Sequence, residues 1–388
     1  MNANPLKTLG TFGQSIWLDY IRRDLITSGQ LRRLIEEDGL EGMTSNPSIF
    51  EKAIVDSHEY DEDIRTMTLE GKGVKAIYET LTQRDVQSAA DEFRSVYDKT
   101  DGHDGYVSLE VNPHLAHETK GTVEEAHRLW KTLARPNIFI KVPATTEGLP
   151  AIQELISEGI NVNVTLLFGL PRYRQVADAY LAGLAARAAR GKSVKHVASV
   201  ASFFVSRIDG LVDPLLEKVI LQGGEKETLA KTVRGRVAIA SAKLAYQIYK
   251  GIFGSDRFKT LADQGARVQR LLWASTSTKN PDESDVKYVE ALIGPDTVNT
   301  APLNTLDAYR DHGNPKARLE QDVEEARLVL ERLPQLGINI DHVTRQLEDD
   351  GVAKFNKPFD KLMDTLAKEC TAAKRRRELN SNRKLLAK

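Results

Sequence analysis

Eight short runs of β-branched and aromatic residues recur along the chain, separated by longer stretches with helical apolar spacing. The strand-like runs occupy residues 15–21, 40–46, 106–111, 138–144, 160–168, 195–205, 268–275 and 296–302. The helical patterns occupy residues 22–37, 74–98, 122–134, 171–190 and 226–250. Strands that alternate with helices predict parallel βα units. Eight such units favour an α/β fold closed into a (β/α)8 TIM barrel, with a doubly wound open sheet as the alternative.

The chain is longer than such a barrel needs. It has 388 residues, whereas roughly 250 are typical of the fold. We therefore expect additional helices, inserted at about 50–100 and 205–262, and a helical C-terminal extension at about 315–388. No internal repeat, low-complexity tract or linker demands a second domain, so we predict a single domain over residues 1–388.

Four of the predicted strands alternate between polar and apolar residues, which is unusual for parallel strands covered by helices. Successive side chains of a strand face opposite ways, so each strand presents one polar face. These faces hold Trp17 and Asp19; Tyr106, Ser108 and Glu110; Phe139 and Lys141; and Asn161, Asn163 and Thr165. In a barrel the apolar faces would meet the helices and the polar faces would point inward. Several polar residues stand near the carboxyl ends of the strands, where barrel enzymes build their sites.

Lys141 stands out because it interrupts the apolar strand "IFIKV". Lysine is seldom fully buried without a partner. Removal from water disfavours the charged form of a lysine and leaves an amine that can attack a carbonyl to form a Schiff base. Carboxylates such as Asp19 and Glu110 would suit the proton transfers of that chemistry. The alternative is that Lys141 forms a structural ion pair.

Composition narrows the class of protein further. The 54 basic and 55 acidic residues nearly cancel, so no overall charge favours nucleic acid or a membrane surface. The single cysteine, Cys370, permits no intramolecular disulfide and fits a reducing compartment. We see neither a secretory signal pattern nor an apolar run of about 18 residues. We therefore expect a soluble, cytoplasmic protein that binds neither nucleic acid nor membrane.

Five motifs resemble one enzyme family, in that family's order along the chain. They are "GMTSNPSIF" (42–50), "VSLEVNPHLA" (107–116), "IFIKVPATTEGLPAI" (138–152), "INVNVTLLF" (160–168) and "SVASFFVSRIDG" (199–210). They resemble the strand-end segments of transaldolases of the longer bacterial type, and the resemblance runs from about residue 14 to past residue 305.

This resemblance implies a cofactor-independent transferase of the pentose phosphate pathway, with no metal. It would move a dihydroxyacetone unit from sedoheptulose 7-phosphate or fructose 6-phosphate to glyceraldehyde 3-phosphate or erythrose 4-phosphate. The sequence leaves open whether the protein is a monomer or a homodimer.

The resemblance also assigns roles to residues near the strand ends. Lys141 matches the family's Schiff-base lysine, and Asp19 matches the aspartate that abstracts the substrate proton. Glu110 matches the carboxylate that works through a bound water, with Thr165 as its threonine partner.

Five further positions match the family's substrate-binding residues or stand near them. Asn46 and Asn163 match the asparagines that hold the dihydroxyacetone hydroxyls, and Ser202 and Arg207 match a phosphate-binding pair. Many relatives carry a phosphate-binding arginine in the segment after the seventh strand. Here that segment reads "ASTSTKN", and Lys279 would keep the charge without the bidentate fork of arginine.

Phe204 bears on which of two related reactions is expected. Transaldolases typically carry phenylalanine at the matching position, whereas fructose 6-phosphate aldolases carry tyrosine. Phenylalanine has no hydroxyl to hold a water, so it favours transfer of the dihydroxyacetone unit over its release. The alternatives are a fructose 6-phosphate aldolase-like lyase and a sugar-phosphate-binding barrel without catalysis.

Overall fold

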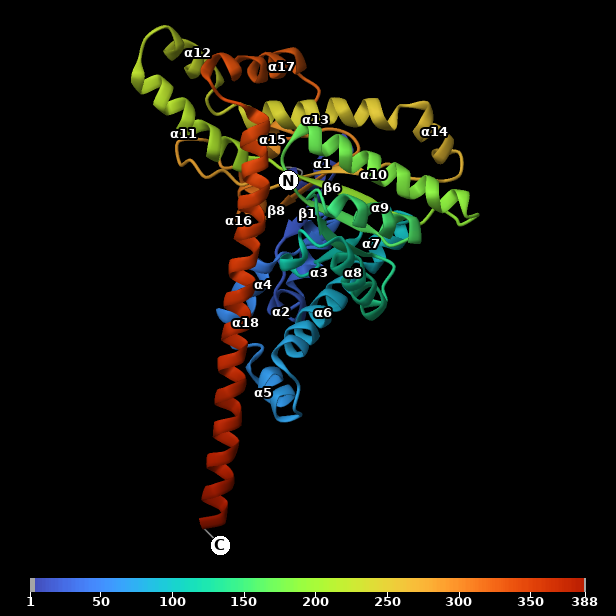
Figure 1. Cartoon of the computed structure of the whole chain (residues 1–388), viewed down its shortest axis with the longest axis vertical. Helices are drawn as coiled ribbons and strands as arrows, with labels where there is room; N and C mark the ends of the chain where they lie inside the picture. The colour runs from blue at the N-terminus through green and yellow to red at the C-terminus, as the bar shows by residue number, and fades with distance from the viewer. Residues whose placement is uncertain (1–3, 387–388) are drawn as a thin grey trace.

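The computed structural model describes residues 4–386, and within them eight parallel strands close into a barrel in sequence order (Figure 1). The strands are β1 Gln14–Asp19, β2 Gly42–Thr44, β3 Tyr106–Glu110, β4 Ile138–Pro143, β5 Val162–Leu167, β6 Ser199–Phe204, β7 Arg270–Ala274 and β8 Thr297–Ala301. The first strand pairs with the last, from Gln14 beside Thr297 to Leu18 beside Ala301. This pairing confirms the predicted (β/α)8 barrel and excludes the open sheet.

Helices surround the barrel and exceed the number that eight βα units require. Those before β5 are α1 Pro5–Leu9, α2 Arg23–Thr27, α3 Gln30–Asp38, α4 Pro47–Val55, α5 Asp61–Leu69, α6 Val74–Glu92, α7 Arg94–Lys99, α8 Thr119–Leu133 and α9 Gly148–Glu158. Those after β5 are α10 Leu170–Ala189, α11 Ser206–Gln222, α12 Glu225–Val233, α13 Val237–Phe253, α14 Asp256–Ala262, α15 Lys287–Ala291, α16 Leu303–His312, α17 Val323–Arg332 and α18 Ile340–Leu386.

Two helices expected to be continuous are each broken in two by a glycine. Gly29 has φ +76° between α2 and α3, and Gly235 has φ +71° between α12 and α13. Glycine adopts this left-handed conformation without the penalty that a Cβ imposes. The apolar periodicity runs through both breaks, which is why the pattern alone predicted one helix in each place.

The last helix, α18, is the longest element of the chain and runs along the side of the molecule past α4 and α5 (Figure 1). Helices α11, α12 and α17 gather near its start, at the opposite end of the molecule from its C-terminus. Within residues 4–386, no helix combines the length and the hydropathy that crossing a bilayer requires.

Aromatic rings fill the barrel toward the amino ends of its strands. Trp17 of β1 stacks on Phe139 of β4 with ring centres 6.1 Å apart, and Tyr106 of β3 stacks on Phe139 at 4.2 Å. Because β1 is not a neighbour of β4, these rings meet across the lumen, as the alternation in the sequence predicts. Gly42 makes room for them, since a Cβ there would lie 2.5 Å from the Trp17 ring.

A buried polar network closes the amino end of the barrel. Arg270 and Asp104 form an ion pair at 2.8 Å, and Ser15 Oγ and Trp17 Nε1 also donate to the Asp104 carboxylate. Burial, together with the Asp104 charge, raises the pKa of nearby Glu41 to about 7. The side chains that close this end leave the carboxyl end of the strands as the face for chemistry.

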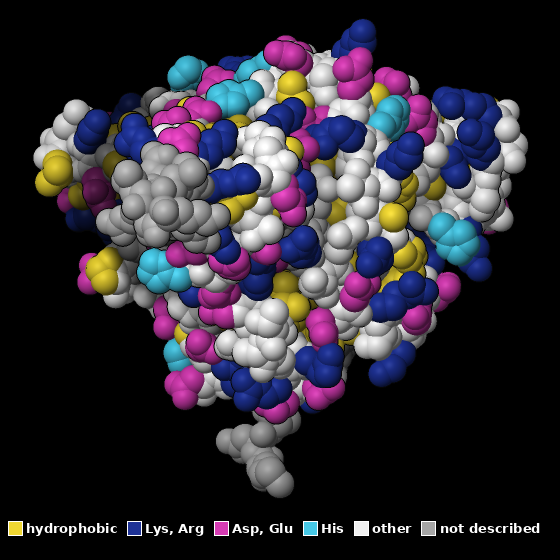
Figure 2. All heavy atoms as spheres, turned by 90° about the horizontal axis from the view of Figure 1, so that it is seen from below, with side chains coloured by type: hydrophobic (Ala, Val, Ile, Leu, Met, Phe, Trp, Pro, Cys, Tyr) yellow, Lys and Arg dark blue, Asp and Glu magenta, His cyan; other side chains and the backbone are white. Residues whose placement is uncertain are grey.

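The surface carries charges of both signs. On the face seen from the C-terminal end of α18, the Lys and Arg side chains are interspersed with Asp and Glu (Figure 2). The mixture matches the near-neutral formal charge of −1.

Candidate active site

Lys141 lies inside the barrel with a charged partner. Its Nζ is 3.4 Å from Glu110 Oε2 on the neighbouring strand and donates to the Ser45 carbonyl oxygen at 3.1 Å. The side chains of Lys141 and Glu110 are 5% and 3% exposed. The ion pair that was considered as the structural alternative therefore exists, but it joins two residues that were both predicted to act in catalysis.

The surroundings raise the pKa values of both carboxylates in the site. Burial raises the pKa of Glu110 to about 7, against the opposing effect of the Lys141 ammonium. Burial also raises the pKa of Asp19, opposed by Lys141, by a hydrogen bond from Thr44 and by Arg207. A carboxyl group that titrates near neutrality can both give and take a proton at physiological pH.

Asp19 is held by a short chain of hydroxyl groups. Thr44 Oγ1 donates to Asp19 Oδ1 at 2.7 Å and lies 2.8 Å from Thr300 Oγ1. These three residues come from β1, β2 and β8, so the hydroxyls fix the carboxylate at the mouth of the barrel. The bond to Thr44 favours the ionised form of Asp19, which is the form that can accept a proton.

A second hydrogen-bonded chain crosses the lumen beside the lysine. Asn163 Nδ2 donates to Ser108 Oγ at 3.0 Å, and Ser202 Oγ donates to Asn163 Oδ1 at 2.6 Å. The structure thus brings Ser202 to Asn163, within the barrel. Asn161, predicted to face inward with Asn163, lies just before β5, and its side chain bonds backbone groups of the segments that lead into β4 and β6.

The carboxyl end of β5 is distorted at Thr165. The pairing of β5 with β6 shifts register between Val164 and Leu167, and Leu166 has φ +55°. A bulge of this kind redirects side chains next to a site. Thr165 Oγ1 is buried and has no hydrogen-bond partner among the described residues, so it is available to a bound water or substrate.

Arg207 stands in the first turn of α11, facing the site. Its guanidinium lies 5.1 Å from the centre of the Phe204 ring, and its buried Nη1 has no partner among residues 4–386. Burial lowers the pKa of Arg207, and the charge of Asp19 opposes that effect. Phe204 in turn packs against Phe168 with ring centres 5.2 Å apart.

Two serines beside Arg207 add further hydrogen-bond donors. Ser206 Oγ and Ser275 Oγ are 3.1 Å apart, and the Ser206 amide donates to the Ser275 carbonyl. Ser275 has φ +56°, a left-handed conformation that is uncommon for residues other than glycine. The first amides of α11 have no side-chain cap, but those of Ser206 and Ile208 donate to the carbonyls of Ser275 and Val205.

Two predicted binding residues have local roles in the structure. Asn46 caps α4, because its Oδ1 accepts from the Ile49 amide at 3.0 Å. Its Nδ2 can still donate to a hydroxyl of the substrate. Lys279 is exposed on the loop between β7 and α15, and its Nζ donates to Ser277 Oγ at 3.2 Å.

The C-terminal helix covers the lysine. Phe355 of α18 is 3% exposed, and its ring centre lies 5.7 Å from Lys141 Nζ. One turn earlier, a Cβ on Gly351 would come within 3.0 Å of Leu166 Cδ2, so the helix approaches β5 closely. The ion pairs Arg172–Glu348 and Lys361–Glu51 and the hydrogen bond between His114 and Asp360 hold α18 in this position.

Several of these residues were not among the predicted site residues. Those that line the site without having been predicted are Thr44, Ser45, Thr300, Ser206, Ser275 and Phe355. Thr44 and Ser206 fall inside motifs that were recognised, so their positions could have been proposed. Phe355 lies more than 200 residues from Lys141 in the sequence, and no local pattern connects the two.

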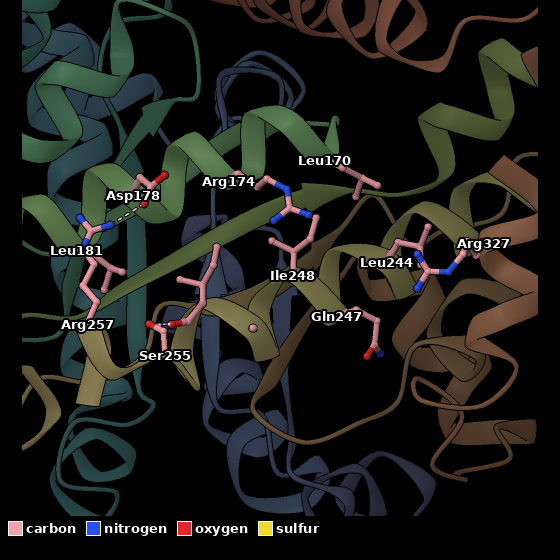
Figure 3. Close-up of a pocket in the computed structure, with 12 residues that line it drawn as sticks. Leu170, Arg174, Asp178, Leu181, Leu244, Gln247, Ile248, Ser255, Arg257 and Arg327 are labelled. Carbon is pink, nitrogen blue, oxygen red and sulfur yellow. Dashed lines mark hydrogen bonds and ion pairs between the residues drawn. The ribbon is translucent and has the colours of Figure 1, made fainter. Parts of the chain in front are cut away.

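A separate hollow of about 540 Å³ lies between α10 and α13 and contains none of the predicted site residues (Figure 3). Its apolar lining includes Leu244 and Ile248, and Arg257 pairs with Asp178 at its edge at 2.7 Å. Among residues 4–386, no group of three or more His, Cys, Asp or Glu side chains is arranged to hold a metal ion.

A buried lysine paired with a carboxylate at the carboxyl end of a (β/α)8 barrel is the arrangement that an aldolase-type enzyme with a Schiff-base lysine requires. Comparison with known proteins then identifies the family. Residues 16–366 match the family model described as Transaldolase/Fructose-6-phosphate aldolase, and the chain belongs to this family.

Proteins named transaldolase are similar to this chain over nearly its whole length. The chain is 50% identical over 370 residues to the "Transaldolase" of Trichodesmium erythraeum, covering 94% of this chain and 97% of that protein. It is 47% identical over 374 residues to the "Transaldolase" of Saccharopolyspora erythraea, covering 96% and 99%. The "Transaldolase 2" of Nostoc punctiforme is 47% identical over 371 residues, covering 94% of this chain and 97% of that protein.

Proposed function

We propose that this protein is a transaldolase that moves a dihydroxyacetone unit between sugar phosphates of the pentose phosphate pathway. The donor is fructose 6-phosphate or sedoheptulose 7-phosphate, and the acceptor is glyceraldehyde 3-phosphate or erythrose 4-phosphate. The observation that carries the proposal is the buried Lys141, 3.4 Å from a carboxyl group whose pKa lies near 7. A cytoplasmic location belongs to the same proposal.

The first half of the reaction forms a covalent intermediate. Lys141 passes a proton to Glu110, and its free amine attacks the ketose carbonyl. Glu110 then gives that proton to the carbinolamine hydroxyl, which leaves as water and gives the imine. Asp19 then takes the proton of the C4 hydroxyl, and the bond between C3 and C4 breaks. The protonated imine accepts the electron pair, so the three-carbon unit stays on Lys141 as an enamine while an aldose phosphate departs.

The second half reverses these steps with another aldehyde. The enamine attacks the acceptor carbonyl, Asp19 returns the proton, and water hydrolyses the new imine with help from Glu110. Asn46 and Asn163 would hold the hydroxyls of the three-carbon unit. Thr165 would position the water through its unpaired hydroxyl.

The phosphate would bind where the donors converge beside Arg207. The unpaired Nη1 of Arg207 and the Ser206 and Ser275 hydroxyls offer donors from the start of α11 and from the loop after β7. Arginine can bind a phosphate through two parallel hydrogen bonds. Lys279 would contribute a more distant charge, and Ser202 would act through its bond to Asn163.

Phe204 supports transfer rather than release of the three-carbon unit. Its ring lies between Phe168 and the Arg207 guanidinium and offers no hydroxyl to protonate the enamine. The enamine would therefore persist until an aldehyde arrives.

Borohydride trapping tests the proposal directly. Treatment with fructose 6-phosphate and borohydride should inactivate the enzyme and add a three-carbon mass to the peptide that contains Lys141. Lys141→Arg should fold but form no adduct, since a guanidinium stays protonated. An adduct on another lysine would refute the assignment.

The distinction between transferase and lyase needs a second assay. Fructose 6-phosphate alone should release about one equivalent of glyceraldehyde 3-phosphate per site and then stall, until erythrose 4-phosphate restores turnover. Phe204→Tyr should increase the release of free dihydroxyacetone. Sustained release by the wild type without any acceptor would favour the fructose 6-phosphate aldolase-like lyase instead.

A further inference from the structure

Asp209 is a buried carboxylate two residues after Arg207, and the proposed mechanism does not use it. It stands in the first turn of α11 and is 3% exposed. Burial and the charge of Asp213 raise its pKa to about 6, so the Asp209 carboxylate is still ionised at neutral pH. A buried charge needs hydrogen-bond donors or a charged partner. The partners of Asp209 therefore indicate which parts of the molecule it holds together.

The two oxygens of Asp209 bind two different helices. Oδ1 accepts from the Ala238 amide in the first turn of α13 at 2.7 Å, and Oδ2 accepts from the Tyr288 hydroxyl of α15 at 2.9 Å. Lys287 Nζ lies 3.7 Å from Oδ2 and offsets the buried charge. Tyr288 is also 3% exposed, so its bond is shielded from solvent. Asp209 thus joins the starts of three helices.

These contacts concern the phosphate site because α15 follows the loop that begins at Ser275. The near end of this loop contacts α11 through the Ser206 and Ser275 hydroxyls, 3.1 Å apart, and its far end is bound to α11 through Tyr288 and Asp209. Ser206 and Asp209 are three residues apart, so they are neighbours on the surface of α11. Arg207 stands between them in the sequence. Both ends of the loop are therefore bound to the helical turn that carries Arg207.

The loop between these two anchors carries Lys279, the more distant charge of the proposed phosphate site. Inside the loop, Thr278 Oγ1 donates to the Ser284 carbonyl at 2.7 Å, and Lys279 Nζ donates to Ser277 Oγ. Both bonds join residues of the same loop, so neither fixes the loop to α11. The spacing between Lys279 and Arg207 therefore depends on the anchors at the two ends.

We propose that Asp209 is a positioning residue of the phosphate site, which holds the first turn of α11 and the loop after β7 at the spacing that a bound phosphate requires. It acts through Arg207 and does not contact the phosphate. Two parallel hydrogen bonds from an arginine demand a fixed geometry, so a small shift of this turn should weaken phosphate binding. The inference rests on the proposed function, which places the phosphate beside Arg207.

Two variants loosen the anchor, and a third serves as the matched control. Tyr288→Phe removes the bond from α15 and keeps the ring. Asp209→Asn keeps the size of the side chain and an acceptor for the Ala238 amide, but removes the charge that Lys287 offsets. Tyr309→Phe makes the same chemical change as Tyr288→Phe at another buried tyrosine, whose hydroxyl has no hydrogen-bond partner among residues 4–386.

The affinity for inorganic phosphate, measured by titration calorimetry, tests the anchor without any turnover. Tyr288→Phe and Asp209→Asn should each weaken phosphate binding several-fold, whereas Tyr309→Phe should bind phosphate as the wild type does. In steady-state assays with fructose 6-phosphate, the first two variants should raise KM by a larger factor than they lower kcat. A mere loss of folded protein would lower kcat and leave KM unchanged, so this difference separates positioning from stability.

A double variant tests whether the effect passes through Arg207. In an Arg207→Ala background, Tyr288→Phe should lose most of its effect on phosphate affinity, because the group that it positions is gone. An equal effect of Tyr288→Phe in both backgrounds would contradict the positioning role.

The outcomes separate this inference from the proposed function. If folded Tyr288→Phe and Asp209→Asn bind phosphate like the wild type, while the wild type forms the borohydride adduct on Lys141, Asp209 is not a positioning residue and the function stands. If the wild type forms no adduct but both variants still lose phosphate affinity, the Schiff base is refuted and the positioning role remains. A wild type that binds no phosphate would refute the phosphate site and the role of Asp209 together.

Discussion

Thr44→Val removes one hydroxyl from the site without changing the shape of the side chain. The Thr44 hydroxyl donates to Asp19 Oδ1 at 2.7 Å and lies 2.8 Å from Thr300 Oγ1, so it links these two residues. Valine is also β-branched and suits strand β2. The variant should therefore fold, and its effect should fall on the protonation of Asp19.

The size of the effect follows from the kind of bond that is lost. A hydrogen bond to a charged group contributes about 1.5–3 kcal/mol, and about 1.4 kcal/mol corresponds to a tenfold change in a protonation equilibrium. Burial already raises the pKa of Asp19, and the bond from Thr44 opposes that rise. Losing the bond should raise the pKa further and favour the protonated form by about tenfold or more.

The pH dependence of kcat for dihydroxyacetone transfer measures this change. Asp19 acts as a base, so the acidic limb of the profile should move to higher pH in Thr44→Val, while the plateau at higher pH changes little. Thr300→Val is the matched control, because it removes a hydroxyl that contacts Thr44 but not Asp19, and it should move the limb much less. An acidic limb that is unchanged in Thr44→Val, or moved equally in both variants, would refute the role given to this bond.

Five further variants test the carboxylates, the phosphate site and the base of the barrel. Asp19→Asn should still form the borohydride adduct but cleave about 10²–10⁴-fold more slowly, whereas Glu110→Gln should slow imine formation itself; identical burst kinetics would contradict the separation of roles. Arg207→Ala should raise KM for phosphorylated substrates, Lys279→Ala should do so more weakly, and added salt should reduce both effects; a variant with the wild-type preference for phosphorylated over unphosphorylated sugars would exclude its residue from the site. The folded pKa of Glu41 near 7 lies above its usual 4.5, so the folded state holds an extra proton between these values and loses stability as pH rises through them. Glu41→Gln should remove that loss, worth about 1–3 kcal/mol in urea unfolding measured between about pH 5 and 8, and an unchanged pH slope would contradict it.

The fold could be predicted from local patterns because each strand and helix carries its own periodicity. The pattern favoured a closed barrel over an open sheet but did not prove it. The pairing of β1 with β8 shows that the barrel is closed. The alternation within β3 and β4 correctly predicted that Glu110 and Lys141 face the lumen, and their side chains meet at 3.4 Å. Asn161, predicted to share the inward face with Asn163, lies just before β5, where its buried side chain bonds the backbone of Ile138 and Ala198.

Other features of the site depend on contacts that no short stretch of sequence encodes. The register shift in β5 falls at Leu166, whose φ of +55° no propensity would predict for a leucine. The pairing of Ser206 with Ser275 joins two loops that are 69 residues apart. Phe355 reaches Lys141 only because α18 passes over the carboxyl end of the barrel, which the sequence indicated merely as a helical extension.

The position of α18 suits one demand of the proposed chemistry. The enamine on Lys141 must be shielded from water until an acceptor aldehyde arrives. The ring of Phe355 is buried and its centre lies 5.7 Å from Lys141 Nζ, so α18 covers the lysine with an apolar group. A helix at the far end of the sequence thereby takes part in the site that the strand ends build.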